Sequence, residues 1–277
     1  MTYLIPEIDL NEVVRRMNAE RLAEWQDTFS DSVPEGKTVE AAKIEPKLED
    51  KVKHILMPLA DTYALGVQAL REAYAEGKCH FLHPVWEFDD CNIVRPLTFK
   101  ENIRARVEDY ERVVGSDGKG RNKEERLRLF SRRLGSCTGI AYKAGTTEFK
   151  IIPISPELVG IKKDFNSHYI GVNYDSLTGI ELDSASGSYN QELTKSQVLD
   201  NPGWITALEE DKNLLQTYAD IVFKELKQDK AMGFYVRSNI DKDELRALFV
   251  DILVSNSDAG GNLYNYGSFL QVVAQSA

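Results

Sequence analysis

The stretch Gly135-Ser-Cys-Thr-Gly-Ile-Ala-Tyr-Lys-Ala-Gly-Thr-Thr-Glu-Phe-Lys-Ile-Ile-Pro-Ile154 decides how this chain is organised. On its N-terminal side the sequence follows helical patterns, whereas here β-branched and aromatic residues recur at every second position. Ile140 and Tyr142 would share one face of a first strand, and Phe149 and Ile151 one face of a second. Because a glycine separates the two runs, the stretch predicts a β-hairpin.

Helical patterns surround the hairpin. Four capping boxes begin at Asp9, Thr98, Thr194 and Asp241, each with Glu or Gln three residues later. Apolar residues at helical spacing follow, which predicts helices over about 9–29, 99–114, 194–227 and 241–253. Further helices are expected over 46–57, 59–75 and 123–134, and short strands over 169–174, 180–182 and 233–237. The prediction is an α+β fold, mostly helical, with a small antiparallel sheet formed from the middle and C-terminal third.

The length of 277 residues fits one large domain or two ordinary ones. A single globular unit over 1–277 is favoured. The glycine-rich connector after the 99–114 helix offers an alternative boundary at 115–136, with a helical part over 1–114 and a small sheet plus helices over 137–277.

Composition limits the classes of function. The net charge of −10 disfavours nonspecific binding to nucleic acid or to anionic membranes. Three cysteines are too few for a disulfide framework, which favours a reducing compartment. No secretory leader is recognisable and no apolar run approaches the length of a membrane span. We therefore expect a soluble, acidic, cytoplasmic protein with no membrane association.

The hairpin carries a Glu-x-Lys motif, Glu148-Phe-Lys150, with both polar side chains on one face of the second strand. This arrangement resembles the core motif of restriction-enzyme-like nucleases, in which carboxylates hold Mg²⁺ and the lysine supports the attacking water. The neighbouring strand lacks an acid, so Asp175 would complete the site, with Asp117 and Asp183 as alternatives. The other interpretation is a solvent-facing pair on an amphipathic strand.

A basic run precedes the hairpin and suggests contact with nucleic acid or another anion. Glutamates interrupt the run, so a solvated helix face is the competing interpretation. The candidate residues are Lys119, Arg121, Arg126, Arg132 and Arg133.

Cysteine and histidine residues gather in one segment that has ligand types suited to Zn²⁺, although paired Cys-x-x-Cys spacing is absent. A structural loop is the alternative. The candidate ligands are Cys79, His80, His83 and Cys91. Cys137 occupies the nucleophile position of a Gly-x-Cys-x-Gly sequence, but a nucleophile elbow needs a strand before it and a helix after it, and here the predicted order is reversed.

The C-terminal half is rich in tyrosine, a residue that suits both pocket linings and protein interfaces. The favoured function is a noncatalytic binding or assembly protein that needs no cofactor. A protein partner or a second copy of the chain is a candidate ligand, and nucleic acid is another. The alternative is a Mg²⁺-dependent nuclease or phosphodiesterase that uses Glu148 and Lys150 together with the basic 119–133 segment.

Overall fold

A computed structural model describes residues 52–75, 85–88, 91–115, 122–253, 257–263 and 267–274. The α-helices are α2 (Tyr63–Ala75), α3 (Phe99–Val114), α4 (Lys123–Arg126), α5 (Pro156–Val159), α6 (Lys195–Asp200), α7 (Pro202–Ala207) and α8 (Lys212–Leu226). Short 3-10 helices are η2 (Arg128–Ser131) and η3 (Tyr174–Ser176). The strands are β1 (Val52–Leu56), β2 (Val85–Phe88), β3 (Cys91–Val94), β4 (Leu134–Tyr142), β5 (Glu148–Ile152), β6 (Ile170–Gly171), β7 (Ile180–Asp183), β8 (Phe234–Tyr235), β9 (Glu244–Val250), β10 (Ala259–Asn262) and β11 (Leu270–Ala274).

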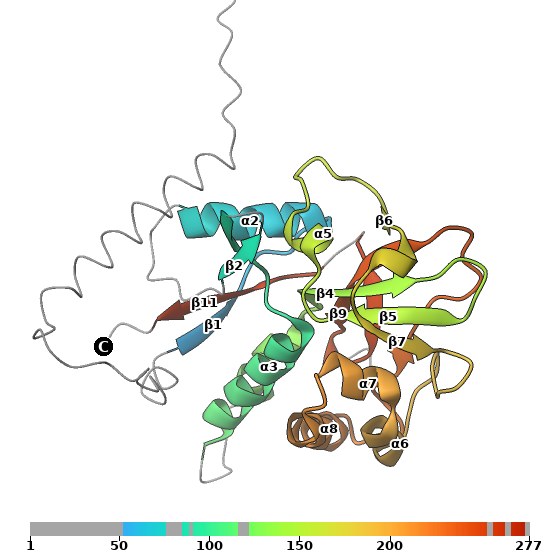
Figure 1. Cartoon of the computed structure of the whole chain (residues 1–277). Coiled ribbons are helices and arrows are strands. Elements are labelled where there is room, and N and C mark those ends of the chain that lie inside the picture. The colour runs from blue at the N-terminus through green and yellow to red at the C-terminus, as the bar shows by residue number, and fades with distance from the viewer. Residues whose placement is uncertain are drawn as a thin grey trace, which may run out of the picture.

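A seven-stranded sheet forms the centre of the fold. Its order is β7-β5-β4-β9-β10-β8, and β6 pairs with β9 on the same side as β10. The β10–β8 pair is parallel and the other pairs are antiparallel. Two separate two-stranded ladders, β1-β11 and β2-β3, lie apart from this sheet. As Figure 1 shows, β4 and β9 therefore bring the middle of the chain beside its C-terminal part.

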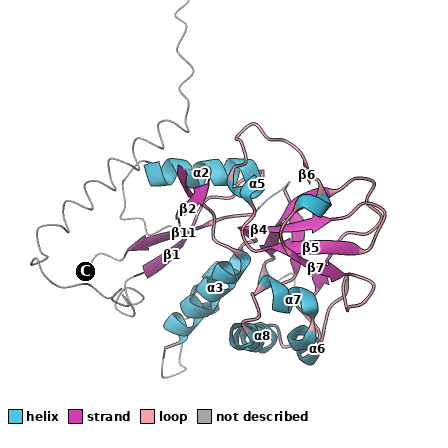
Figure 2. Cartoon of the chain, in the orientation of Figure 1, coloured by secondary structure: helices cyan, strands magenta, loops and turns pink. Residues whose placement is uncertain are grey.

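The two faces of the sheet carry separate apolar cores. Ile140, Phe149 and Leu248 point to the face covered by α3, α7 and α8, whereas Ala141 and Leu245 point to the face covered by α2 and α5. This alternation is what a strand buried on both faces requires. Figure 2 shows the helices distributed around the strands in this way.

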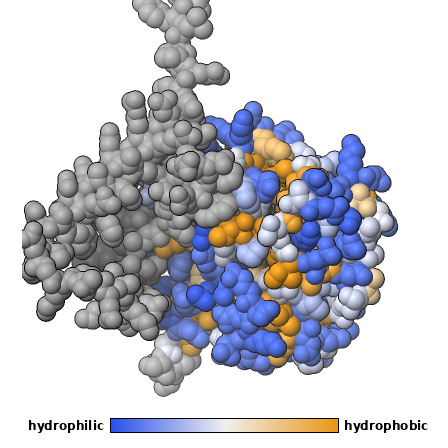
Figure 3. Space-filling view, viewed as in Figure 1, coloured by the Kyte–Doolittle hydropathy of each residue, from blue (hydrophilic) through white to orange (hydrophobic). Residues whose placement is uncertain are grey.

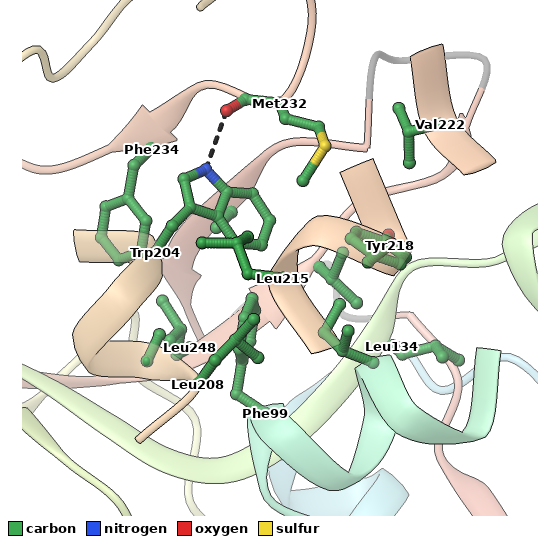
Figure 4. Packing of buried hydrophobic residues seen from close by; sticks show 14 of the residues in the cluster. Phe99, Leu134, Trp204, Leu208, Leu215, Tyr218, Val222, Met232, Phe234 and Leu248 are labelled. Atoms are coloured by element: carbon green, nitrogen blue, oxygen red, sulfur yellow. Dashed lines mark hydrogen bonds between the residues drawn. The ribbon is translucent and has the colours of Figure 1, made fainter. Parts of the chain in front are cut away.

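Trp204 of α7 is at the centre of the larger core. Its indole is fully buried and its Nε1–H donates to the backbone oxygen of Met232 at 2.8 Å. The ring centroid lies 5.6 Å from that of Phe99 and 6.0 Å from that of Phe234 (Figure 4). One side chain thereby joins α3, α7 and the β8 edge of the sheet.

A bulge in β4 holds the start of α3. The pairing register with β9 shifts between Gly135 and Gly139. Within this bulge the Thr138 hydroxyl accepts a hydrogen bond from the backbone N–H of Phe99 at 2.9 Å and donates to the oxygen of Pro153 at 2.8 Å. The bulge redirects polar groups of the strand toward the helix terminus, where unpaired N–H groups need acceptors.

The prediction of a mostly helical fold with a small sheet is wrong, because the principal sheet has seven strands. The largest error is β9, whose residues Glu244–Val250 were expected within a helix over 241–253. A strand buried on both faces is a nearly continuous apolar run, and such a run satisfies helical spacing as well. Val52–Leu56 was also expected within a helix, over 46–57, and is instead strand β1, which pairs with β11.

The expected hairpin and the expected start of α3 are confirmed. The hairpin is β4–β5, with Gly145 in its turn at φ +67°, a conformation that glycine adopts without strain. Helix α3 begins at the predicted capping box of Thr98 and Glu101. The expected helix over 194–227 is divided into α6, α7 and α8, and the helix expected over 9–29 lies outside the described residues.

Candidate functional site

Two open hollows flank β6. The first has a volume of about 530 Å³ and the second about 520 Å³. The first is lined by Glu157, Ile161, Lys162, Asp164, Phe165, Asn166, Ser167 and Ile170, and the second by Tyr169, Gly171, Val172, Asn173, Lys242 and Asp243. We call these lining residues together the β6 surface.

The first hollow has an apolar floor and a polar rim. Ile161 is buried, Phe165 and Ile170 are half-buried, and Lys162, Asp164 and Asn166 are exposed. In Figure 1 the loop between α5 and β6 arches above the sheet, and Figure 3 shows apolar surface on this side of the molecule as separate patches among polar residues. An apolar floor with a few polar groups around it is the usual composition of a ligand site.

Strand β6 is two residues long, so side chains of neighbouring elements hold this loop in place. Arg71 of α2 donates to the backbone oxygens of Val159 and of Ile161, the latter at 3.2 Å. The Asp243 carboxylate accepts from the backbone N–H of Tyr174 at 3.1 Å and of Ala144 at 2.9 Å. These two hydrogen bonds lower the pKa of Asp243, so it stays ionised and joins the loop to the hairpin turn.

Next to the second hollow, β9 carries a buried ion pair. Glu244 and Arg246 are 4% and 6% exposed, and Arg246 Nε lies 2.9 Å from Glu244 Oε1. Arg237, about half exposed, places Nη1 3.5 Å from the same carboxylate oxygen. The Arg246 guanidinium carbon lies 5.9 Å from the ring centroid of Tyr169, which lines the second hollow.

The structure brings the three predicted catalytic residues into one cluster. Lys143 Nζ lies 3.2 Å from Glu148 Oε2 and 3.3 Å from Asp175 Oδ1, so one ammonium group bridges the two carboxylates. Lys150 donates to the backbone oxygens of Tyr174 and Leu177 at 3.1 and 3.2 Å. The carbonyls of the η3 segment therefore hold the Lys150 ammonium group, which also lies 4.3 Å from the Tyr174 ring centroid.

The part of the basic segment that the structure describes is largely paired with acids. Arg126 lies 3.5 Å from Glu225, and Arg133 lies 2.9 Å from Asp251. Arg132 is exposed and has no ion pair with a described residue. Lys119 and Arg121 lie outside the described residues.

The zinc hypothesis falls mostly outside the described part of the chain. Cys79, His80 and His83 are not described, and only the backbone of Cys91, at the start of β3, is. Within the described ranges no group of three or more His, Cys, Asp or Glu side chains could hold a metal ion.

Cys137 lies within β4 and is fully buried. Burial raises the pKa of its thiol to about 12, although the neighbouring Arg95 opposes that rise. A buried, protonated thiol is a poor nucleophile.

Tyr169 is one of the tyrosines of the C-terminal half, which the sequence analysis expected in a pocket lining or a protein interface. The signal for Arg246 and Glu244 was hidden because both were placed on a helix. Tyr174 and Tyr189, two other tyrosines of the C-terminal half, are buried. No helix among the described residues is long and apolar enough to cross a bilayer.

No protein-family model and no curated protein matches the chain. A solved chain does match, with a TM-score of 0.51 and 15% sequence identity, over 81% of this chain and 99% of the other. The solved structure is described as "Accommodation of massive sequence variation in Nanoarchaeota by the C-type lectin fold". This chain has a C-type lectin-like fold. The likeness supports the correction above, since it places a curled sheet rather than helices at the centre of the molecule.

Proposed function

We propose that this protein is a noncatalytic binding module that presents its ligand site on the β6 surface. The observation that carries the proposal is how the 157–173 loop is built. Arg71, Lys150 and Asp243 fix its two ends through hydrogen bonds to backbone atoms. Because these hydrogen bonds involve the backbone of the loop, they constrain its path without using its own side chains.

The side chains between these anchors are available to a ligand. Lys162, Asp164, Asn166 and Asn173 are exposed around the two hollows. The solved chain of similar fold is described as a C-type lectin fold that accommodates massive sequence variation. In this chain, side chains from outside the loop hold the loop backbone, so the loop's own side chains can vary without changing its path. This arrangement would tolerate such variation, and it supports a binding role here.

The experiment is a screen of soluble fragments against ¹⁵N-labelled full chain, followed by mapping of amide shifts. The library covers saccharides, carboxylates, phosphates, amines and short peptides. We expect the hits to gather on amides of the β6 surface, because ligand sites are the surfaces that bind small molecules most readily. Hits that gather elsewhere, or a screen with no hit on this surface, would overturn the proposal.

A matched pair of variants sharpens the screen. Phe165→Ser removes the aromatic ring from the floor of the first hollow, and Phe223→Ser removes a ring that is also half-buried but lies on α8. Both substitutions should lower the free energy of unfolding by a similar amount in a denaturant series, yet only Phe165→Ser should abolish the hits in the first hollow. Equal loss in both variants would count against the site.

The nuclease alternative has one supporting observation, the approach of Glu148 and Asp175 to a single ammonium group. A Mg²⁺ ion between these carboxylates would have to displace Lys143. Incubation of plasmid and single-stranded DNA with Mg²⁺ tests it directly. The binding proposal predicts the same background cleavage with the natural chain and with Glu148→Ala, and cleavage that this substitution removes would favour the alternative.

A further inference from the structure

The residues across β6 and β9 form two facing columns beside the second hollow. Ile170 pairs with Leu245 and Gly171 with Glu244, and the N–H of Val172 donates to the oxygen of Asp243 at 3.4 Å. This register brings Tyr169 opposite Arg246 and Asn173 opposite Lys242, since side chains alternate along paired strands. The two columns therefore present an aromatic ring, an amide and several charges on one face.

Space is left at the middle of these columns. Gly171 lies opposite Glu244 and has no heavy atom within 4 Å of the position that a Cβ would occupy. On the side away from β4, β9 pairs with β6 through residues 244 and 245 and with β10 through residues 247–250. Arg246 therefore lies where one partner strand ends and the other begins. The opening over Gly171 thus adjoins the buried ion pair.

The charges around this opening are unbalanced. Arg237 and Arg246 share the single carboxylate of Glu244. Lys242 is exposed and has no ion pair with a described residue, while the carboxylate of Asp243 already accepts two backbone hydrogen bonds. Lys242 and Asp243 are the charged residues that line the second hollow. Beside it, Arg237 and Arg246 contact the one carboxylate of Glu244, which pairs with the lining residue Gly171.

The buried pair is poorly explained as a source of stability. Removing two charges from water costs free energy that their attraction recovers only in part, and apolar residues of similar size often stabilise as much. Leu248 and Val250 occupy the same face of β9 further along the strand and are apolar. A role in fixing the direction of the guanidinium groups accounts better for a charged pair at this end of the strand.

We propose that the opening over Gly171, at the edge of the second hollow, binds an anionic group of the carboxylate or phosphate type. Lys242 and the outer N–H groups of Arg237 hold the anion. Glu244 orients Arg237, and Arg246 balances the charge of Glu244. Guanidinium groups suit this task because their planar N–H donors match the oxygens of carboxylates and phosphates. The inference rests on the proposed binding function and adds the class of ligand to it.

The test is a titration of ¹⁵N-labelled full chain with sodium phosphate, sodium succinate and, as a neutral probe, glycerol. We expect saturable shifts of the Gly171 and Asn173 amides with at least one of the anions and none with glycerol. Binding that is restricted to one anion would identify the chemical source, and binding of both would indicate a general anion site. The inference would be overturned if neither phosphate nor succinate shifted these amides saturably.

Two variants separate this site from ordinary surface charge. Arg237→Gln combined with Lys242→Gln should weaken anion binding about tenfold, because two exposed charge interactions together contribute about 1–2 kcal/mol. Arg132→Gln removes another exposed charge, from the basic segment, and should leave the affinity unchanged. Unchanged affinity in the double variant, or a loss in Arg132→Gln, would refute the assignment. If fragments bind the β6 surface and anions do not, the proposed function stands and only this inference fails.

Discussion

Replacing Asp243 by alanine should release the β6 loop while leaving the sheet intact. The carboxylate accepts hydrogen bonds from the backbone N–H groups of Ala144 and Tyr174, at 2.9 and 3.1 Å. A hydrogen bond to a charged acceptor contributes about 1.5–3 kcal/mol, and partial exposure of Asp243 places each at the lower end of that range. The loss of both therefore costs about 3 kcal/mol locally.

Native-state hydrogen exchange measures this effect at the two donors themselves. Since 1.4 kcal/mol corresponds to a factor of ten, the amides of Ala144 and Tyr174 should exchange about tenfold to a hundredfold faster in Asp243→Ala. Amides of β4 and β9 that pair with each other should keep their protection. Asp241→Ala, at an exposed position two residues away, is the matched control and should leave both amides unchanged.

Acid should reproduce the substitution in the natural chain. Hydrogen bonds from Ala144 and Tyr174 hold the pKa of Asp243 below its ordinary value of 3.8. The carboxylate therefore contributes stability above that value, and the contribution is lost as the pH falls through the lowered pKa. The reasoning is refuted if both amides remain equally protected in Asp243→Ala, or if protection decreases by the same factor throughout the core.

Three other outcomes are expected. Trp204→Phe should lower the free energy of unfolding by about 2–4 kcal/mol in urea titrations, because it leaves a cavity and removes the donor to Met232; a cost below about 1 kcal/mol would contradict the packing described. Burial, with added repulsion from Glu192 and Asp251, raises the pKa of Asp258 from 3.8 to about 6, so stability should fall as the pH rises through this interval, and Asp258→Asn should flatten that dependence. Alkylation of Cys137, followed by mass spectrometry, should be slow in the native chain and rapid in urea, and rapid native labelling would show that the thiol is accessible.

Local patterns predicted the elements whose shape depends on nearby residues. The capping box at Thr98 identified the start of α3 because both of its hydrogen bonds join residues three positions apart. The β4–β5 hairpin was predictable for the same reason, since a short turn connects its strands. The Glu148 and Lys150 side chains lie on one face of β5, as predicted, where Glu148 is 3.2 Å from Lys143 and Lys150 is 3.9 Å from Glu181.

The identity of β9 could not be obtained in this way. Its partners are β4, about a hundred residues earlier, together with β6 and β10, so its hydrogen bonds form only when the chain has folded. Leu245, Leu248 and Phe249 fit helical spacing, and the sequence signal at Asp241 and Glu244 resembles a helix cap. In the folded chain Asp243 accepts hydrogen bonds from two other loops instead.

By itself, the sequence determined the hairpin, helix α3, the acidic character of the chain and the segments that carry polar candidate site residues. Each of these follows from composition or from residues a few positions apart. The tertiary structure decided that a seven-stranded sheet, and not helices, occupies the centre, and that Lys242 and Arg246 meet the 169–173 segment at one surface. Pairing between distant strands sets both outcomes, because the register of β6 on β9 determines which side chains share a face.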